Sequence, residues 1–364
     1  MLPDLTIDEV VAAYEQCRRT KRSSESAIEF EVNFSRNIMA IYNAVRDQTW
    51  KPAGHMCFVV KNPKAREVWA SNFADRVVHH LCYHRLRPRF EPYWIATTFA
   101  CIEGRGTTGA AEWAERSARR VTQGWSQPAW LLQVDIKNFF PRIHRQTLHD
   151  MLAPRIYEPW LAHLVNEIIN VDVTRDAHFP GDPTLLRLIP KHKSLWHAEP
   201  GRGLPIGNLT SQFGANVYLD RMDQRIARSG VVKHYGRYVD DIVLMDPDID
   251  NLRAAYRMIV EELAALGLDL HPEKTRCIRV ADGFDFCGRY ILPRRTYLRR
   301  RTAKRGSQAI EDMERNTHKG ETLTSYFALA RACNSHRLRK QWAIRASSHG
   351  VVTMRNHTKA RAKS

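Results

Sequence analysis

Tyr238-Val239-Asp240-Asp241-Ile242-Val243-Leu244-Met245 carries the strongest signal in the sequence: two adjacent carboxylates between apolar, β-branched and aromatic residues. The pattern predicts two short strands with the Asp240–Asp241 pair at or beside a tight turn. Two carboxylates this close repel each other unless a divalent cation binds them. Since Mg²⁺ prefers one or two carboxylates plus phosphate oxygens, the pair indicates a reaction of a nucleoside triphosphate. A solvated turn is the alternative for an isolated pair of this kind.

A third carboxylate follows another apolar stretch. Residues 130–140 read Trp-Leu-Leu-Gln-Val-Asp-Ile-Lys-Asn-Phe-Phe, which places Asp135 at the end of a predicted strand. An acid at the end of a buried strand is costly unless a partner pairs with it. Asp135, Asp240 and Asp241 together can hold two metal ions, as in-line nucleotidyl transfer requires.

These two motifs resemble the palm of a reverse transcriptase. Between them, as that family requires, residues 203–219 read Gly-Leu-Pro-Ile-Gly-Asn-Leu-Thr-Ser-Gln-Phe-Gly-Ala-Asn-Val-Tyr-Leu. Group II intron relatives usually carry Gln-Gly near the start of this block and Ser-Pro in its middle. This chain has Ile206-Gly207 and Ser211-Gln212 there. That departure resembles the reverse transcriptases of diversity-generating retroelements.

The resemblance implies an α+β right-hand polymerase fold: fingers, a palm of antiparallel sheet backed by helices, and a helical thumb. We expect an N-terminal helical extension at 1–50, fingers at 51–134, palm at 135–290 and a basic helical thumb at 291–364. The palm region includes part of the fingers and an irregular insert at 172–200, which is rich in Pro, Asp, His and Gly. At typical domain sizes, we expect no RNase H or endonuclease domain after the palm.

The resemblance also implies roles for site residues. Two Mg²⁺ ions would bind Asp135 and Asp241, with Asp240 and the carbonyl of Ile136 completing the ligands. Lys274 would protonate the leaving pyrophosphate, although a solvated lysine is equally consistent with the sequence. Lys64 and Arg66 lie where two predicted strands meet at a Pro-containing turn. In the resembled family this hairpin folds over the triphosphate, so its cations would neutralise phosphate charge; a solvated basic turn is the alternative.

The nucleotide itself would contact further residues. Phe140 lies five residues after Asp135, where polymerases of this type place a bulky side chain that rejects a 2′-hydroxyl. Alternatively, Phe139 and Phe140 both belong to the core. Ile206 replaces a polar residue that in relatives helps to fix the template–dNTP geometry, and retroelement enzymes are error-prone opposite template adenines. The residues expected near the nascent base pair are Ile206, Gly207, Asn208, Ser211 and Gln212.

The charge of the chain points to a polyanionic partner. The formal net charge is +17; residues 289–364 hold 19 Lys or Arg against 4 Asp or Glu, and the rest of the chain holds 37 against 35. Binding to a polyanion through this region should weaken steeply with salt. A disordered basic tail is the alternative. The residues expected to contact nucleic acid are Arg105, Tyr238, Arg299, Arg300, Arg301, Lys304 and Arg305.

Composition excludes several classes of protein. No apolar run reaches the length of a membrane span, and acidic residues interrupt any signal peptide at the N-terminus. The seven cysteines show no CxxC spacing, so we expect a reduced, cytoplasmic protein without disulfides or a zinc site. His79, His80, Cys82 and His84 do not place three ligands on one helix face, which argues against a metal site there.

The sequence therefore predicts an RNA-directed DNA polymerase that uses Mg²⁺, dNTPs and a template RNA, and that holds an RNA–DNA hybrid. Resemblance to the retroelement enzymes adds a structured template RNA and a small basic accessory protein. One alternative is a reverse transcriptase of phage defence or of the group II intron type. The other is a catalytically inactive polymerase fold that binds RNA, against which the presence of all three acids argues.

Overall fold

A four-stranded antiparallel sheet lies at the centre of the part that carries the carboxylates. The computed structural model describes residues 4–19, 24–61, 64–314 and 320–347. The strand order is β5-β6-β3-β7, comprising β5 (His234–Tyr238), β6 (Asp241–Asp246), β3 (Trp130–Asp135) and β7 (Arg276–Arg279). Strands β5 and β6 form a hairpin whose turn contains Val239 and Asp240. The predicted strand–turn–strand arrangement is confirmed.

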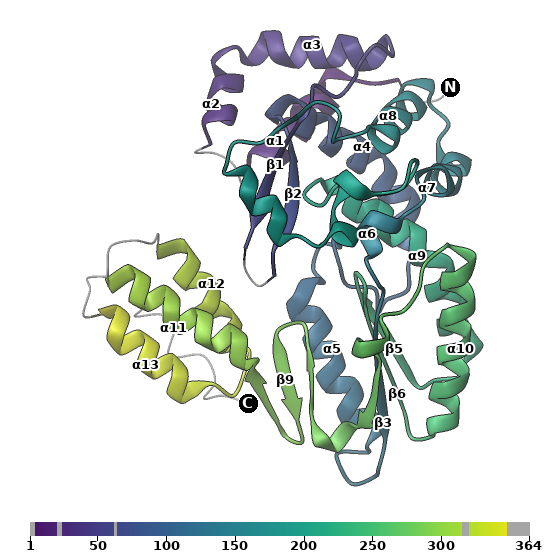
Figure 1. The fold of residues 1–364 in the computed structure, drawn as a ribbon, viewed down its shortest axis with the longest axis vertical. Helices are drawn as coiled ribbons and strands as arrows, with labels where there is room; N and C mark the ends of the chain where they lie inside the picture. The colour runs from purple at the N-terminus through teal and green to yellow at the C-terminus, as the bar shows by residue number, and fades with distance from the viewer. Residues whose placement is uncertain (1–3, 20–23, 62–63, 315–319, 348–364) are drawn as a thin grey trace.

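Helices cover both faces of this sheet (Figure 1). Helices α9 (Leu209–Ser229) and α10 (Ile249–Ala265) pack with Leu132, Val134, Ile242 and Leu244 in one core cluster, and α5 (Gly106–Val121) packs with Leu131, Val243 and Met245 in another. Successive side chains of a strand point to opposite faces. Burial of both faces therefore explains why β6 is apolar almost throughout instead of alternating.

Two smaller sheets flank the central one. Strands β1 (His55–Val60) and β2 (Arg66–Ser71) form the predicted hairpin, and β4 (Ala177–His178) of the 172–200 insert pairs in parallel with β1. The other sheet, β8 (Phe284–Phe286), β9 (Arg289–Leu292) and β10 (Arg295–Leu298), is antiparallel. The insert otherwise consists of short 3₁₀ turns, as its composition indicates.

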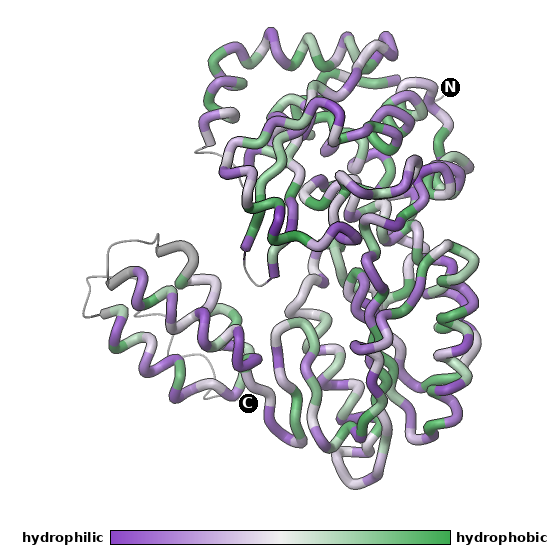
Figure 2. Tube along the Cα trace, viewed as in Figure 1, coloured by the Kyte–Doolittle hydropathy of each residue, from purple (hydrophilic) through white to green (hydrophobic). Residues whose placement is uncertain are grey.

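The rest of the described chain is mainly helical. Figure 2 shows polar and apolar residues alternating along α3 and α10, the pattern of amphipathic helices. The stretch 146–170 is broken by a 3₁₀ turn and restarts at Pro159. The remaining helices are α1 (Ile7–Arg18), α2 (Glu25–Val32), α3 (Phe34–Arg46), α4 (Phe73–Phe90), α6 (Phe139–Arg142), α7 (Arg145–Leu152), α8 (Pro159–Asn170), α11 (Arg300–Glu314), α12 (Gly320–Arg331) and α13 (His336–Ser347).

Helices α11, α12 and α13 form a separate bundle to one side of the sheets (Figure 1). Their core contains Ile310, Phe327 and Trp342. The expected domain limits remain predictions, and strands β3 and β9 run across two of them, at 134/135 and 290/291. Residues 348–364 of the expected basic thumb lie outside the described residues.

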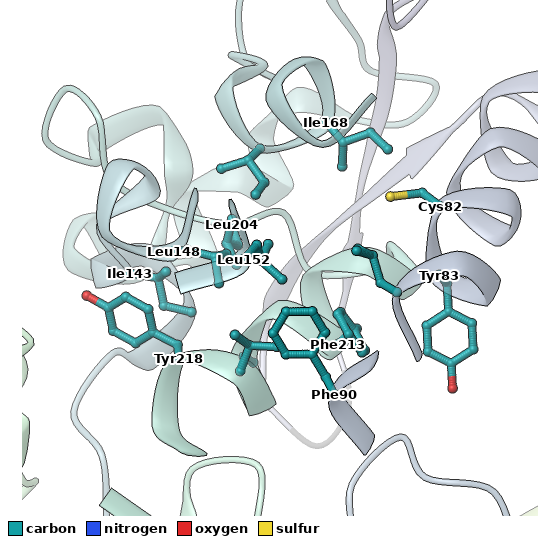
Figure 3. Close-up of a cluster of buried hydrophobic side chains, with 14 of the residues drawn as sticks. Cys82, Tyr83, Phe90, Ile143, Leu148, Leu152, Ile168, Leu204, Phe213 and Tyr218 are labelled. Atoms are coloured by element: carbon teal, nitrogen blue, oxygen red, sulfur yellow. The ribbon is translucent and has the colours of Figure 1, made fainter. Parts of the chain in front are cut away.

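A cluster of apolar side chains joins the central sheet unit to the helices above it (Figure 3). Phe213 of α9 lies at its centre, 2% exposed, with its ring edge-on to Tyr83 and Phe90 of α4 at centroid distances of 5.7 Å. Leu148 and Leu204 line the same narrow void beside it, of about 20 Å³. The cluster therefore fixes α9, which precedes β5 in the chain, against α4 and α7.

Replacing Phe213 by Ala should lower the free energy of unfolding by about 3–5 kcal/mol, since the change leaves a cavity in a packed core. Chemical denaturation of the wild type and the variant measures the difference. Leu188→Ala is the control, because Leu188 is 55% exposed and its truncation should change stability by less than about 0.5 kcal/mol. Equal losses in the two variants would contradict this account of the core.

In the described residues, no helix is long and apolar enough to cross a membrane. All seven cysteines are free, which agrees with the expected absence of a disulfide framework.

Candidate active site

The three carboxylates of the sequence motifs come together at one end of the central sheet. Asp135 and Asp241 are directly opposite each other in the antiparallel register of β3 and β6, so their side chains lie on the same face. Asp240 lies in the adjoining turn, where its carbonyl accepts a hydrogen bond of 3.1 Å from the N–H of Ile136. Residues more than a hundred positions apart in the chain thus form one acidic group.

Crowding and burial raise the pKa of two of these acids. Burial, followed by the charge of Asp135, raises the pKa of Asp240. The pKa of Asp241 is raised to about 7 by burial, and further by the charges of Asp240 and Asp135. Mutual repulsion of this kind is relieved by a cation.

Lys274 supplies one positive charge. Its Nζ lies 2.5 Å from Oδ1 of Asp135, close to where the sequence-based prediction placed a proton donor. Within the described residues, no three His, Cys, Asp or Glu side chains are already arranged to hold a metal ion. The lysine contact and the acidic crowding together show that this group attracts cations.

A buried ion pair supports the carboxylate turn. Arg237 and Asp223 are 0% and 1% exposed, and Nη2 of Arg237 lies 2.6 Å from Oδ2 of Asp223. Nη1 of the same arginine donates to the carbonyl of Val239 at 3.0 Å. Val239 has a φ of 56°, which is unfavourable for a β-branched residue. Arg237 therefore stabilises a strained turn, a role that the sequence analysis did not identify.

The carboxylates line an open cavity of about 430 Å³. The predicted residues found along it are Lys64, Arg66, Asp135, Ile136, Phe140, Ile206, Gln212, Tyr238, Asp240, Asp241 and Lys274. Both phenylalanines line the cavity; Phe139 is 2% exposed and belongs to the core, whereas Phe140 is only partly buried. The sequence analysis missed Asn138, Ile189, Lys193 and His271, which line the same cavity. No local motif marks these four.

Three predicted residues of the 203–219 block do not line this cavity. Asn208 and Ser211 are each 5% exposed, and Oδ1 of Asn208 accepts a hydrogen bond of 3.1 Å from Ser71. Gly207 has a φ of 130°, and a Cβ there would lie 2.4 Å from the carbonyl oxygen of Trp69. Asn208 and Gly207 thus lie against β2, whereas Ser211 lines the small void beside Phe213. The contact of the three residues with a base pair remains a prediction.

The predicted nucleic-acid contacts lie elsewhere. The guanidinium of Arg105 donates to the carbonyls of Ile95 and Thr98 at 2.9 and 2.8 Å, so it holds a loop. Arg299 precedes α11 and pairs with Asp285 of β8 at 3.0 Å. The other four cations lie along the first turns of α11: Arg300, Arg301, Lys304 and Arg305.

Comparison with known proteins identifies the family. The family model "Reverse transcriptase (RNA-dependent DNA polymerase)" matches residues 59–291, which include the three carboxylates, Lys274 and the cavity. The chain belongs to the reverse transcriptase family. With that assignment, the central sheet and its helices correspond to the palm of this reverse transcriptase and the β1–β2 hairpin to its fingers. Helices α11–α13 lie beyond the matched residues, and their role as the thumb remains a prediction. The expected α+β right-hand fold is confirmed.

Individual similarities to this reverse transcriptase are distant. Protein YkfC of Escherichia coli (strain K12) is 22% identical over 288 residues, which cover 67% of this chain and 68% of YkfC. Two structures of apo telomerase from Candida tropicalis, one truncated from the C-terminal domain, are 13% and 12% identical, with TM-scores of 0.48 and 0.46. The matches cover 68% and 66% of this chain, which spans 55% and 47% of the telomerase chains, about half of their length.

Removal of one partner of the ion pair between Arg237 and Asp223 should lower the stability of this reverse transcriptase. Asp223→Ala leaves the guanidinium of Arg237 buried without a counter-charge, which should lower the free energy of unfolding by about 3–5 kcal/mol. Denaturation of the double variant Arg237→Met/Asp223→Leu is the comparison, because it removes both charges and should lose less than the single variant. A double variant that is the less stable of the two would contradict this role.

Proposed function

We propose that the protein is an active RNA-directed DNA polymerase that extends a primer on a template RNA with dNTPs. The observation that carries the proposal is the meeting of Asp135, Asp240 and Asp241 at one sheet end, lining a cavity with Lys64, Arg66 and Lys274. Carboxylates beside Lys and Arg side chains suit a metal-bound triphosphate, because the acids bind the metal and the basic side chains bind phosphate.

The donor set fits a divalent metal. Burial and, after it, the charges of the neighbouring carboxylates raise the pKa of Asp240 and Asp241, so the three acids would gain from a dication, and oxygen donors are those that Mg²⁺ prefers. Asp135, Asp240 and Asp241 would hold it, with the carbonyl of Ile136 nearby. When bound, the metal supplies charge stabilisation to the transferred phosphoryl group. Lys274 forms an ion pair with Asp135, and its ammonium group would deliver a proton to the leaving group.

Other residues of the cavity would select the substrate. Phe140 lines the cavity, and its ring would leave no room for a ribose 2′-hydroxyl, which favours deoxynucleotides. Tyr238 and Gln212 line the same cavity and would contact the growing duplex. The cations at the start of α11 and Arg299 would follow the phosphates of the RNA–DNA hybrid.

Neutralising a single carboxylate should abolish DNA synthesis. Asp240→Asn, or Asp135→Asn, should reduce primer extension on an RNA template by about 10³-fold or more, with RNA binding retained. Extension with dNTPs in the presence and absence of Mg²⁺, and RNA binding by filter retention, give the two readouts. Asp250→Asn is the matched control, because Asp250 is an exposed carboxylate paired with Arg253 at the start of α10. Equal behaviour of wild type and Asp240→Asn would instead favour an RNA-binding module without polymerase activity.

We further propose that synthesis is error-prone at template adenines, as in a diversity-generating retroelement. The supporting observation is that Ile206, where relatives carry a polar side chain, lines the cavity as an apolar residue. A pocket wall without a hydrogen-bonding group discriminates less between correct and incorrect pairs. This proposal includes a structured template RNA, a small basic accessory protein and a cytoplasmic setting; a role in phage defence or a group II intron is the competing proposal.

Sequencing of the extension products tests the second proposal. Substitutions should concentrate at template adenines in the wild type, and Ile206→Gln should reduce their frequency, since the amide restores a polar contact beside the base pair. The control is Leu188→Gln, because Leu188 is 55% exposed and does not line the cavity; this change should leave the error spectrum unchanged. DNA synthesised by the wild type without these errors would still support the polymerase proposal, but it would favour an intron-like or defence role.

A further inference from the structure

The irregular insert 172–200 forms one side of the active-site cavity. Lys193 of the insert, in a short 3₁₀ turn, lines the cavity that also contains Lys64, Arg66 and Lys274. The side chains come from three separate parts of the chain: the β1–β2 hairpin, the insert and the 3₁₀ turn 272–274. The sequence analysis assigned no role to the insert.

Three of the four Lys and Arg side chains that line this cavity form no ion pair with a described residue. Among the described residues, Lys274 alone of these four has a carboxylate within 4.0 Å, namely Asp135. Lys193 is close enough to the others for their charges to act on it: burial lowers its pKa, and Lys64, Lys274 and Arg66 lower it further, in that order, while Asp135 raises it. Several like charges held together in this way favour a ligand that carries several negative charges at one place.

The backbone next to Lys193 is attached to strand β2. Glu67 of β2 is 3% exposed; its Oε2 accepts a hydrogen bond of 2.9 Å from Oγ of Ser194, and its Oε1 accepts one from the N–H of Leu195. Trp196 packs against Trp69 of β2, with ring centroids 5.5 Å apart. The residues that immediately follow Lys193 are therefore bound to the strand that carries Arg66.

We propose that Lys193 binds the polyphosphate of the incoming nucleoside triphosphate together with Lys64 and Arg66, and that Glu67 positions it. A triphosphate concentrates several negative charges within one group, whereas a template backbone offers one charge per nucleotide. A cluster of cations beside the carboxylates suits the former. The inference rests on the proposed polymerase function, since that function supplies the triphosphate.

Steady-state primer extension measures the effect on the nucleotide. Lys193→Ala should raise the KM for dNTP about tenfold, the size of one lost charge-assisted hydrogen bond, with kcat and the Kd for template–primer within about twofold of wild type. Lys193→Arg should restore most of the loss. Lys191→Ala is the matched control, because Lys191 lies in the same exposed turn but does not line the cavity, and it should behave as wild type.

Binding of inorganic tripolyphosphate, measured by calorimetry on the full chain, separates this inference from the proposed function. The wild type should bind it, and Lys193→Ala should bind about tenfold more weakly. If the wild type makes no DNA but shows this difference, the polymerase proposal fails and the anion site stands. Unchanged KM and unchanged tripolyphosphate binding in Lys193→Ala would overturn the inference, as would a loss confined to template–primer affinity.

The role of Glu67 is tested by coupling. Glu67→Gln removes the carboxylate charge that holds Ser194 and Leu195, so it should raise the KM for dNTP through Lys193 alone. Its effect should then largely disappear in the background of Lys193→Ala. Additive effects of the two substitutions would show that Glu67 does not act through Lys193.

Discussion

The buried pair of Arg237 and Asp223 is the constraint on which the active-site geometry depends. Asp223 also accepts hydrogen bonds from Thr98 at 2.9 Å and from Tyr235 at 2.5 Å, and the backbone of 97–99 pairs with Arg237. The ion pair thus joins α9, β5 and the segment before α5. Replacing such a pair by apolar residues is often neutral for stability. We therefore infer that the pair acts mainly by orienting the guanidinium of Arg237, which donates a hydrogen bond to the carbonyl of Val239 in the strained turn.

The position of the ion pair also determines where Asp135, Asp240 and Asp241 meet. Once the turn is fixed, the antiparallel register of β3 and β6 places Asp135 directly opposite Asp241. Packing and hydrogen bonding elsewhere in the palm therefore hold the carboxylates close together. Burial and the neighbouring charges oppose ionisation there, which is why the pKa values of Asp240 and Asp241 are raised.

Much of this could be predicted from the sequence, for identifiable reasons. Asp135 and the Asp240–Asp241 pair stand out because acids next to buried strands are rare without a partner, and the C-terminal end of α10 is marked by Gly267, whose φ of 69° only glycine adopts readily. The 203–219 block was harder to interpret. Gln212 faces the cavity, whereas its neighbour Ser211 is buried. Both residues belong to α9, so a shift of one position along the helix decides whether a side chain reaches the cavity. The position of Lys193 in the cavity could not be predicted from the sequence. It depends on the contacts of its neighbours Ser194 and Leu195 with Glu67, which lies 126 positions before Lys193.

The loop that carries Ile206 and Gly207 is attached to the fingers hairpin. The N–H of Trp69 donates to the carbonyl of Ile206 at 2.7 Å, and Gly207 lies so near Trp69 that no side chain fits between them. Glu67, two residues earlier on the same strand, holds the insert. The hairpin is therefore linked both to the 203–208 loop and to the insert. A closing motion of the hairpin over a bound nucleotide that preserves these contacts would carry the loop and the insert with it, so that the contacts with the triphosphate and with the base pair would change together.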